Sequence, residues 1–190
     1  MKPAVLLWSV CTALGLFAGF SPEAGAGAVR PLKPLDGSVR AEDFVLKDLD
    51  GRTVRFSRFR GNVVLLNFWA TWCTSCLQEL PALERLYRTY RSRGFVVVAV
   101  SLDRAPASAV RAFVKELDLS FPVLHDPDQA TGRLYGAWGL PFSFLIGAGG
   151  RIAYRIPGEY DWDAREARAA VETLLEEAGR SAGGKPGGET

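Results

Sequence analysis

Hydrophobic positions along the chain fall into two kinds of segment. Residues 63–69 and 95–101 are apolar almost throughout, which is typical of strands buried on both faces of a sheet. Residues 74–91 have a helical period instead. Its predicted inner face consists of Leu77, Leu80, Leu83, Leu86, Tyr87 and Tyr90. The alternation of the two kinds predicts an α/β domain.

Shorter elements complete this pattern. Residues 44–56 predict two strands around an Asp-Gly turn, which is an N-terminal β-hairpin. The other expected elements are helices at residues 107–117, 128–135 and 163–177, a short strand or extended link at 121–124, and strands at 142–146 and 151–155. The last two strands flank a glycine-rich turn and predict a second hairpin. The sheet is therefore expected to be mixed, with helices on both faces.

The N-terminal 28 residues differ from the rest of the chain. Lys2 precedes an uncharged apolar run, Ala4 to Phe20, and small residues follow at 24–28. This order is typical of a signal peptide, and an uncleaved membrane anchor is the alternative. The apolar run is at the short end for crossing a bilayer. Either outcome predicts an exported domain, periplasmic or anchored to the outer side of the cytoplasmic membrane, which contacts the membrane only through this segment.

Composition and charge limit the possible domain organisation and partners of the rest of the chain. The sequence has 190 residues, 48% hydrophobic and 23% charged, which fits one globular domain with appendages. We expect a linker at residues 29–40, the domain at 41–178 and a disordered glycine-rich tail at 179–190. The net charge is only +2, with both signs interspersed. This distribution argues against a nucleic-acid partner.

The cysteines carry the chemistry of the chain. Cys11 lies in the N-terminal apolar run, so the exported part keeps Cys73 and Cys76. They follow a predicted strand directly and open a predicted helix, where free N–H groups and the helix dipole favour a thiolate on Cys73. Cys76 lies one turn further on, within reach as the resolving thiol. A disulfide across so short a loop stabilises the fold little, which favours a redox role over a structural one.

Other uses of this cysteine pair fit the sequence less well. A zinc site needs two more ligands, and the exported part offers only His125. Covalent haem attachment requires a histidine directly after the second cysteine, where this chain has Leu77. We therefore expect no metal and no cofactor. A peroxidase that uses Cys73 stays open as an alternative.

Several residues near the cysteines admit two interpretations. Glu79 is either a solvated helix carboxylate or a proton acceptor for Cys76. Pro141 either starts an edge strand or forms a cis bond in a functional turn. Asn67, a polar residue in an apolar strand, is expected to pair with a neighbouring backbone. Trp69 and Trp72 are expected to shield the thiols, and Trp72 also to contact substrate.

Taken together, these motifs resemble the thioredoxin superfamily, and most closely its exported TlpA/ResA-like branch of thiol-disulfide oxidoreductases. The resemblance covers roughly residues 44–160 and depends on an ordered set of segments. These are residues 44–51, 61–73, 79–81, 98–101 and 135–141, with residues 107–124 as the helix–strand insert of the branch. It implies a thioredoxin-like mixed sheet flanked by helices on both faces.

The resemblance also implies roles for individual residues. Cys73 would be the exposed nucleophile, Cys76 its buried partner in a redox disulfide, Pro141 the cis-proline and Glu79 the acid near the thiols. Trp72, Leu140 and Phe142 would contact substrate. Ser75, Phe142 and Gly147 depart from the usual proline, threonine and acid. Ser75 is expected to add a donor toward Cys73 and to shift the reduction potential upward.

The function implied is reduction of disulfides in partner proteins. The expected substrates are apocytochrome c or a copper-site protein, and the expected electron donor is a membrane thiol reductant. A thiol oxidant or isomerase on the same fold is the first alternative. A non-catalytic binding module with a structural disulfide is another.

Overall fold

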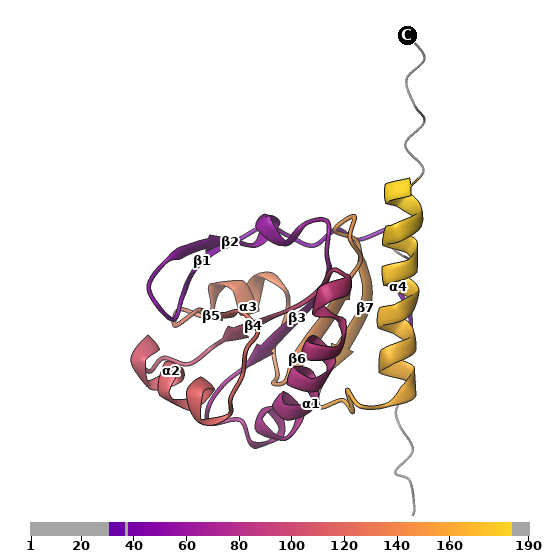
Figure 1. Ribbon diagram of the computed structural model, residues 1–190. Helices are drawn as coiled ribbons and strands as arrows, with labels where there is room; N and C mark the ends of the chain where they lie inside the picture. Colours follow the sequence, from indigo (N-terminus) through magenta and orange to yellow (C-terminus); the bar gives the residue numbers. More distant parts are fainter. Residues whose placement is uncertain (1–30, 37, 184–190) are drawn as a thin grey trace, which may run out of the picture.

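The computed structural model describes residues 31–36 and 38–183 (Figure 1). The predicted signal or anchor segment lies outside these ranges. The strands are β1 (Val45–Asp48), β2 (Thr53–Arg55), β3 (Val63–Trp69), β4 (Phe95–Ser101), β5 (Val123–His125), β6 (Phe142–Ile146) and β7 (Ile152–Pro157). The helices are η1 (Phe56–Phe59), α1 (Thr74–Tyr90), η2 (Arg91–Arg93), α2 (Ala107–Glu116), α3 (Ala130–Leu134) and α4 (Arg165–Gly183).

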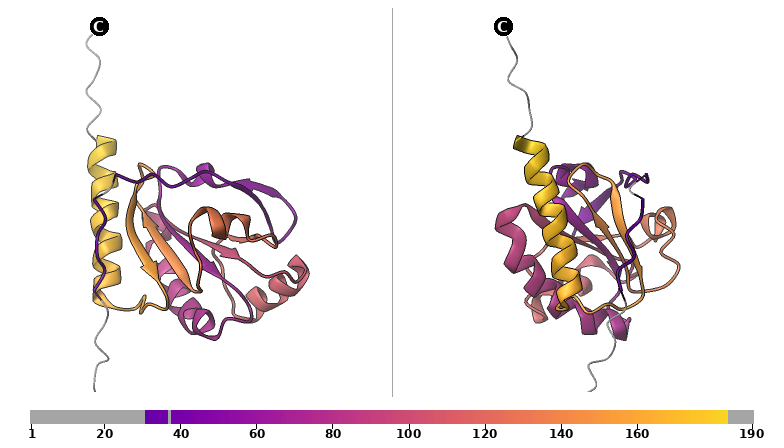
Figure 2. Two further views of the ribbon diagram at one scale, coloured as in Figure 1. Left: turned by 180° about the vertical axis from the view of Figure 1, so that it is seen from behind. Right: turned by 90° about the vertical axis from the view of Figure 1, so that its right-hand side faces the viewer.

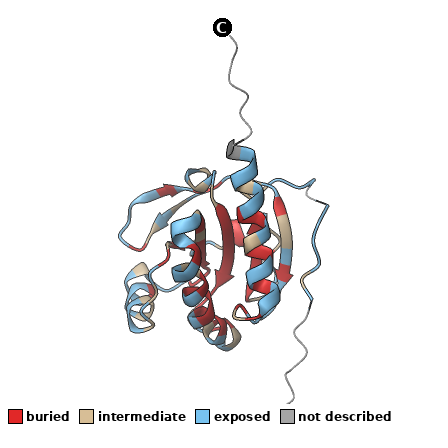
Figure 3. Cartoon of the chain, turned by 45° about the vertical axis from the view of Figure 1, so that its right-hand side comes forward, coloured by how far each residue is buried: buried red, intermediate tan, exposed pale blue. Residues whose placement is uncertain are grey.

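The strands form one mixed sheet in the order β2-β1-β5-β4-β3-β6-β7. Strand β3 lies near its middle, parallel to β4 and antiparallel to β6. All seven β3 residues are buried, because helices and loops cover both faces of the sheet (Figure 3). The apolar run at residues 63–69 reflects this double burial.

Alternate β3 residues belong to two hydrophobic clusters. Val63, Leu65 and Trp69 pack with apolar residues of α1, α2 and α4. Val64, Leu66 and Phe68 pack with the opposite cluster, which holds aromatic residues of the N-terminal hairpin region and the segment after α3. The views in Figure 2 show the sheet between these layers. The thioredoxin-like fold class with helices on both faces is confirmed.

The helix–strand insert connects the N-terminal hairpin to the rest of the sheet. Helix α2 leads to β5, which pairs parallel with β4 and antiparallel with β1. The link expected at residues 121–124 is thus a real strand, shifted by about two residues. Local pattern fixes such boundaries poorly, since the pairing partners lie elsewhere in the sequence.

Both ends of the domain extend further than the sequence pattern predicts. Residues 34–36 and 38–40, part of the expected linker, lie along the free edge of β7, where Leu35 N–H donates to the carbonyl of Ala153 at 2.8 Å. An edge strand offers unpaired backbone groups, and this segment covers them. At the other end, α4 continues to Gly183 and includes residues 179–183 of the expected disordered tail. Among the described residues, no helix has the length and apolarity needed to cross a bilayer.

Candidate active site

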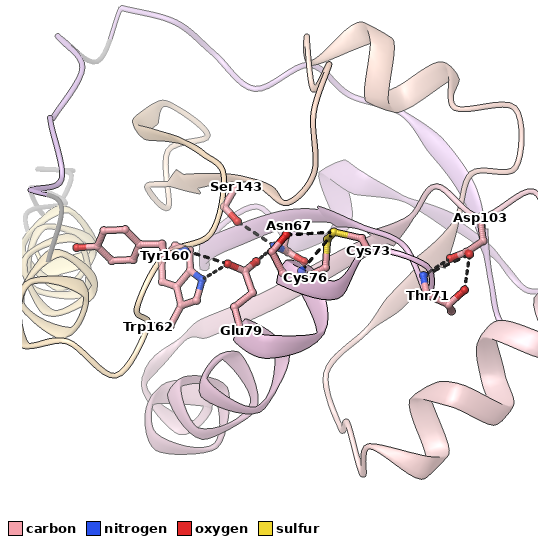
Figure 4. The surroundings of a disulfide bond; sticks show 10 residues. Asn67, Thr71, Cys73, Cys76, Glu79, Asp103, Ser143, Tyr160 and Trp162 are labelled. Carbon is pink, nitrogen blue, oxygen red and sulfur yellow. Dashed lines mark hydrogen bonds between the residues drawn. A yellow bond between two sulfur atoms is a disulfide. The ribbon is translucent and has the colours of Figure 1, made fainter. Parts of the chain in front are cut away.

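The junction of β3 and α1 places Cys73 at the helix N-cap. Its backbone is extended, with φ −93° and ψ 99°, and its sulfur accepts the N–H of Cys76 at 3.2 Å. Cys73 and Cys76 form a disulfide (Figure 4). A side chain at an N-cap accepts free N–H groups of the first turn, and the helix dipole favours negative charge there. Reduction would therefore leave Cys73 in a position that stabilises its thiolate.

The two sulfur-bearing residues differ in exposure. Cys73 keeps 8% of its surface accessible and Cys76 none. The assignment of Cys76 as the buried partner agrees with this geometry. Cys73 is less exposed in the oxidised protein than the resemblance implied, since only 8% of its surface is accessible. Incoming disulfides can reach only Cys73.

Ser75 lies beside the Cys73 sulfur. Its Oγ is 3.6 Å from Sγ, and the hydroxyl is the donor, because a disulfide sulfur carries no hydrogen. The expected extra donor toward Cys73 is thus the side-chain hydroxyl of Ser75. The sequence alone did not indicate which group of Ser75 would donate. A long sulfur contact of this kind is weak but favours a thiolate acceptor.

Substitution of Ser75 by alanine should therefore lower the reactivity of reduced Cys73 at acidic pH. We expect roughly a two- to tenfold slower alkylation by iodoacetamide near pH 5, the equivalent of one modest hydrogen bond. The check is the pH profile of the alkylation rate in the reduced protein. Threonine at position 75, which keeps the hydroxyl, is the control and should behave like the natural chain. An unchanged profile for Ser75→Ala would contradict a role for this hydroxyl.

Glu79 lies one turn after Cys76 and is buried, with 3% of its surface exposed. Its Oε1 accepts the side-chain amide of Asn67 at 2.8 Å. Its Oε2 accepts the backbone N–H of Tyr160 at 3.2 Å and Nε1–H of Trp162 at 3.3 Å. Figure 4 shows dashed lines from these donors to the carboxylate, which lies to the left of the disulfide. The solvated interpretation of Glu79 is therefore wrong.

Burial raises the pKa of Glu79 from 4.5 to about 7. The hydrogen bonds from Tyr160, Asn67 and Trp162 lower the pKa and offset part of this effect, while the negative charge of Glu159 adds to the rise. A carboxyl group with a pKa near neutrality can both accept and release a proton at physiological pH. Glu79 thus has the acidity required of a proton acceptor in thiol chemistry.

Asn67 connects this acid to the sheet. Its amide donates both to Glu79 and, at 2.9 Å, to the hydroxyl of Ser143 on β6. The prediction that Asn67 pairs with a neighbouring backbone is wrong for its side chain. The residue is fully buried, and its Oδ1 has no hydrogen-bond partner within the described part of the chain. Asn67 therefore fixes the position of the carboxylate.

A second buried acid holds the turn before Cys73. Asp103, two residues after the end of β4, accepts the backbone N–H of Thr71 at 3.0 Å and its hydroxyl at 2.6 Å. It also accepts the hydroxyl of Ser101 at 2.8 Å. Nothing in the local sequence marks Asp103 as part of the site, since Thr71 lies 32 residues away. This contact fixes the loop that carries Trp72 and Cys73.

A second loop borders the disulfide. The peptide bond between Leu140 and Pro141 is cis. Leu140 and Cys73 line one groove of about 640 Å³, together with Trp72 and Trp138. Phe142 does not line it: the side chain is buried and stacks on Phe144. Trp69 is also absent from the groove, because it is fully buried against Phe113.

Besides Asp103, four residues of this site were not identified from the sequence as parts of it. Ser143, Tyr160 and Trp162 reach Asn67 or Glu79 across 76 to 83 positions, so no local signal marks them. Trp138 precedes the cis-proline closely, and its aromatic character was a usable signal. Within the described residues, no group of three or more His, Cys, Asp or Glu side chains could hold a metal ion.

The fold and the disulfide at a helix N-cap define a thioredoxin-fold thiol–disulfide oxidoreductase. Comparison with protein families agrees, since the AhpC/TSA family matches residues 38–155. The chain belongs to this family and, within it, to the ResA-like thiol-disulfide oxidoreductases.

Individual relatives support this placement. The thiol-disulfide oxidoreductase ResA of Geobacillus thermodenitrificans is 36% identical over 156 residues, which cover 81% of this chain and 84% of that protein. The solved structure of StoA from Bacillus subtilis has 27% identity and a TM-score of 0.56, and covers 73% of this chain and 96% of that one. A secreted Mycobacterium tuberculosis disulfide oxidoreductase homologous to Escherichia coli DsbE has 25% identity and a TM-score of 0.59, over 67% of this chain and 94% of that one.

Proposed function

We propose that the protein is an exported reductase of disulfides in partner proteins, with Cys73 and Cys76 as its redox pair. The observation that carries this proposal is the disulfide at the N-cap of α1, with a buried acid of raised pKa one turn further on. A structural disulfide needs neither an adjacent proton acceptor nor a groove that reaches one of its sulfur atoms.

The proposed reaction has two exchange steps. The Cys73 thiolate attacks one sulfur of the substrate disulfide, forms a mixed disulfide and releases the other substrate sulfur as a thiolate. The Cys76 thiolate then attacks the Cys73 sulfur, which forms the Cys73–Cys76 disulfide and releases the second substrate thiolate. Two electrons pass to the substrate, whose thiolates take up protons, and the enzyme is oxidised.

Cys76 must lose its proton before the second step. Because Cys76 is fully buried, its thiolate gains no stabilisation from water. Glu79 is proposed as the acceptor of this proton, since its pKa of about 7 leaves a large fraction ionised at neutral pH. Pro141 is proposed to shape the loop opposite Cys73, and Trp72 and Leu140 to contact the substrate chain. Phe142, which is buried and follows Pro141 directly, would support this loop from its buried side.

Substrates and location extend the proposal. The ResA-like relatives support a disulfide-containing protein as substrate, and we propose apocytochrome c or a copper-site protein. A membrane thiol reductant would restore the dithiol after each cycle. The N-terminal segment and the secreted relative support export to the periplasm or to the outer side of the membrane, with or without an anchor.

A redox titration of the purified protein tests this proposal. The protein is equilibrated in dithiothreitol or glutathione buffers, and the fraction of free thiol is measured by alkylation and mass spectrometry. We expect a two-electron transition well below about −200 mV, in the range of reductants. A transition near about −120 mV would instead indicate an oxidant or isomerase. Absence of any transition would contradict redox function and favour a binding module.

A further inference from the structure

None of the described residues that line the groove beside the disulfide is charged. Eleven residues line it, from the Cys73 turn, α1, the end of β4 and the loops before α3 and β6. Its polar members, such as Thr74, Gln78 and Gln129, are uncharged. This neutrality is unusual for the chain as a whole, since 23% of its residues are charged. A charged substrate residue would lose water here without gaining an opposite charge.

Two tryptophans border the groove. Trp72 is 67% exposed and Trp138 is 79% exposed, the highest values among the exposed large hydrophobic residues of the described chain. Trp72 lies on the turn before Cys73 and Trp138 on the loop before Pro141. Exposed tryptophans of this kind are enriched where proteins contact partners, because each buries a large area at low entropic cost.

Arg155 of β7 contacts the loop that carries Trp138. Arg155 of β7 donates weakly to the carbonyl of Gly136 at 3.4 Å, and its guanidinium lies 4.9 Å from the ring centre of Phe142. Gly136 has φ +63°, and a Cβ at this position would lie 3.6 Å from Nε1 of Trp138 and 3.8 Å from Nη2 of Arg155. The indole therefore rests over Gly136 while most of its surface faces solvent.

We propose that Trp72 and Trp138 make this groove selective for substrate disulfides flanked by aromatic or aliphatic residues. This inference rests on the proposed function and specifies its substrate class. The substrate segment would be uncharged next to its reacting cysteine and would pack an apolar side chain against Trp138. The main-chain N–H and C=O of Leu140 have no partner in the described part of the chain, so an extended segment can pair with them.

Competition between peptides tests the selectivity. Three peptides, each closed by one intramolecular disulfide, carry phenylalanine, glutamate or lysine next to the first cysteine. The dithiol form of the full protein reduces each peptide, and the rate of peptide reduction is measured. Oxidised glutathione is the reference substrate, since it is a disulfide too small to fill the groove. We expect kcat/KM for the phenylalanine peptide to exceed that of both charged peptides by about five- to tenfold. We also expect little dependence of its rate on salt, because no charge lines the groove.

Variants assign this preference to the indole. Trp138→Ala should lower kcat/KM for the phenylalanine peptide about fivefold more than it lowers kcat/KM for oxidised glutathione, while Trp138→Phe should retain most of the preference. Val45→Ala removes an exposed apolar side chain on β1, outside the groove, and is the matched control. Analytical ultracentrifugation checks whether the two tryptophans instead join two copies of the chain.

Three outcomes would overturn the inference. Equal kcat/KM for the three peptides, or an equal loss for peptide and glutathione in Trp138→Ala, would remove the specificity role. A dimer that Trp138→Ala dissociates would assign the surface to self-association. Failure of the natural chain to reduce even glutathione would contradict the proposed function itself, which the loss of peptide preference alone would not.

Discussion

Replacement of Cys73 by serine is expected to abolish thiol–disulfide exchange, with a fall in rate of at least about three orders of magnitude. Cys73 is the cysteine that lines the groove, and its sulfur occupies the N-cap of α1. Serine keeps the size and the N-cap hydrogen bond but is not a nucleophile toward disulfides. Folding should be retained, because serine is among the preferred N-cap residues.

Replacement of Cys76 by serine should have a different result. The first step remains available, so Cys73 forms a mixed disulfide that no internal thiol can resolve. We expect a stable covalent complex with a disulfide peptide, detected by mass spectrometry and reversed by dithiothreitol. The Cys73→Ser variant is the matched control and should form none.

The two single variants also discriminate between reaction classes. Full turnover by Cys76→Ser would contradict the two-cysteine mechanism. Peroxide consumption that survives the loss of Cys76 would favour the peroxidase alternative. Full biological activity of Cys73→Ser would favour a binding module.

Replacement of Glu79 by glutamine is expected to slow the resolution of the mixed disulfide by about a hundredfold near neutral pH, the usual size of a lost general base. In the natural chain, the resolution rate should rise with pH through about 7, because Glu79 must be ionised to accept the proton. The variant should lose this inflection. Stopped-flow measurement of substrate thiol release from pH 5 to 9 provides the check, and an unchanged pH profile would exclude Glu79 as proton acceptor.

The same acid should make the stability of the oxidised protein depend on pH. The folded pKa of about 7 lies above the ordinary value of 4.5, so the folded state binds this proton more tightly than the unfolded chain does. Between these two values, rising pH therefore destabilises the fold, by about 3 kcal/mol in all. Urea unfolding of the oxidised protein from pH 4 to 8 should show this loss, and Glu79→Gln should remove it.

Glu84 offers a control of opposite sign on the same helix. Although burial raises its pKa, hydrogen bonds from Ser120 and Arg88 lower the pKa overall. Glu84 therefore stabilises the fold at pH values above its ordinary pKa of 4.5, and this stabilisation is lost as pH falls below that value. Glu84→Gln should therefore leave the decline between pH 4.5 and 7 intact. Equal effects of the two substitutions would contradict the special role of Glu79.

The sequence by itself determined the order of elements and the position of the reacting sulfur. Runs such as residues 63–69 and the helical period of 74–91 depend on side chains a few positions apart, and the structure has β3 and α1 within a residue of these ranges. The N-cap at Cys73 is equally local, since its bond to Cys76 spans three residues. Local regularities of this kind can be read from a chain directly.

Only the tertiary structure decided which side chains act together. Glu79 became a buried acid because Asn67, Tyr160 and Trp162 enclose it, and two of these lie 81 and 83 residues away in the chain. Trp69 and Trp72 are three residues apart, yet one is fully buried and the other exposed, since β3 ends between them. Burial sets the proton affinity of Glu79 and the surface that Trp72 offers a substrate. Burial is a property of the whole packed chain, which local periodicity does not contain.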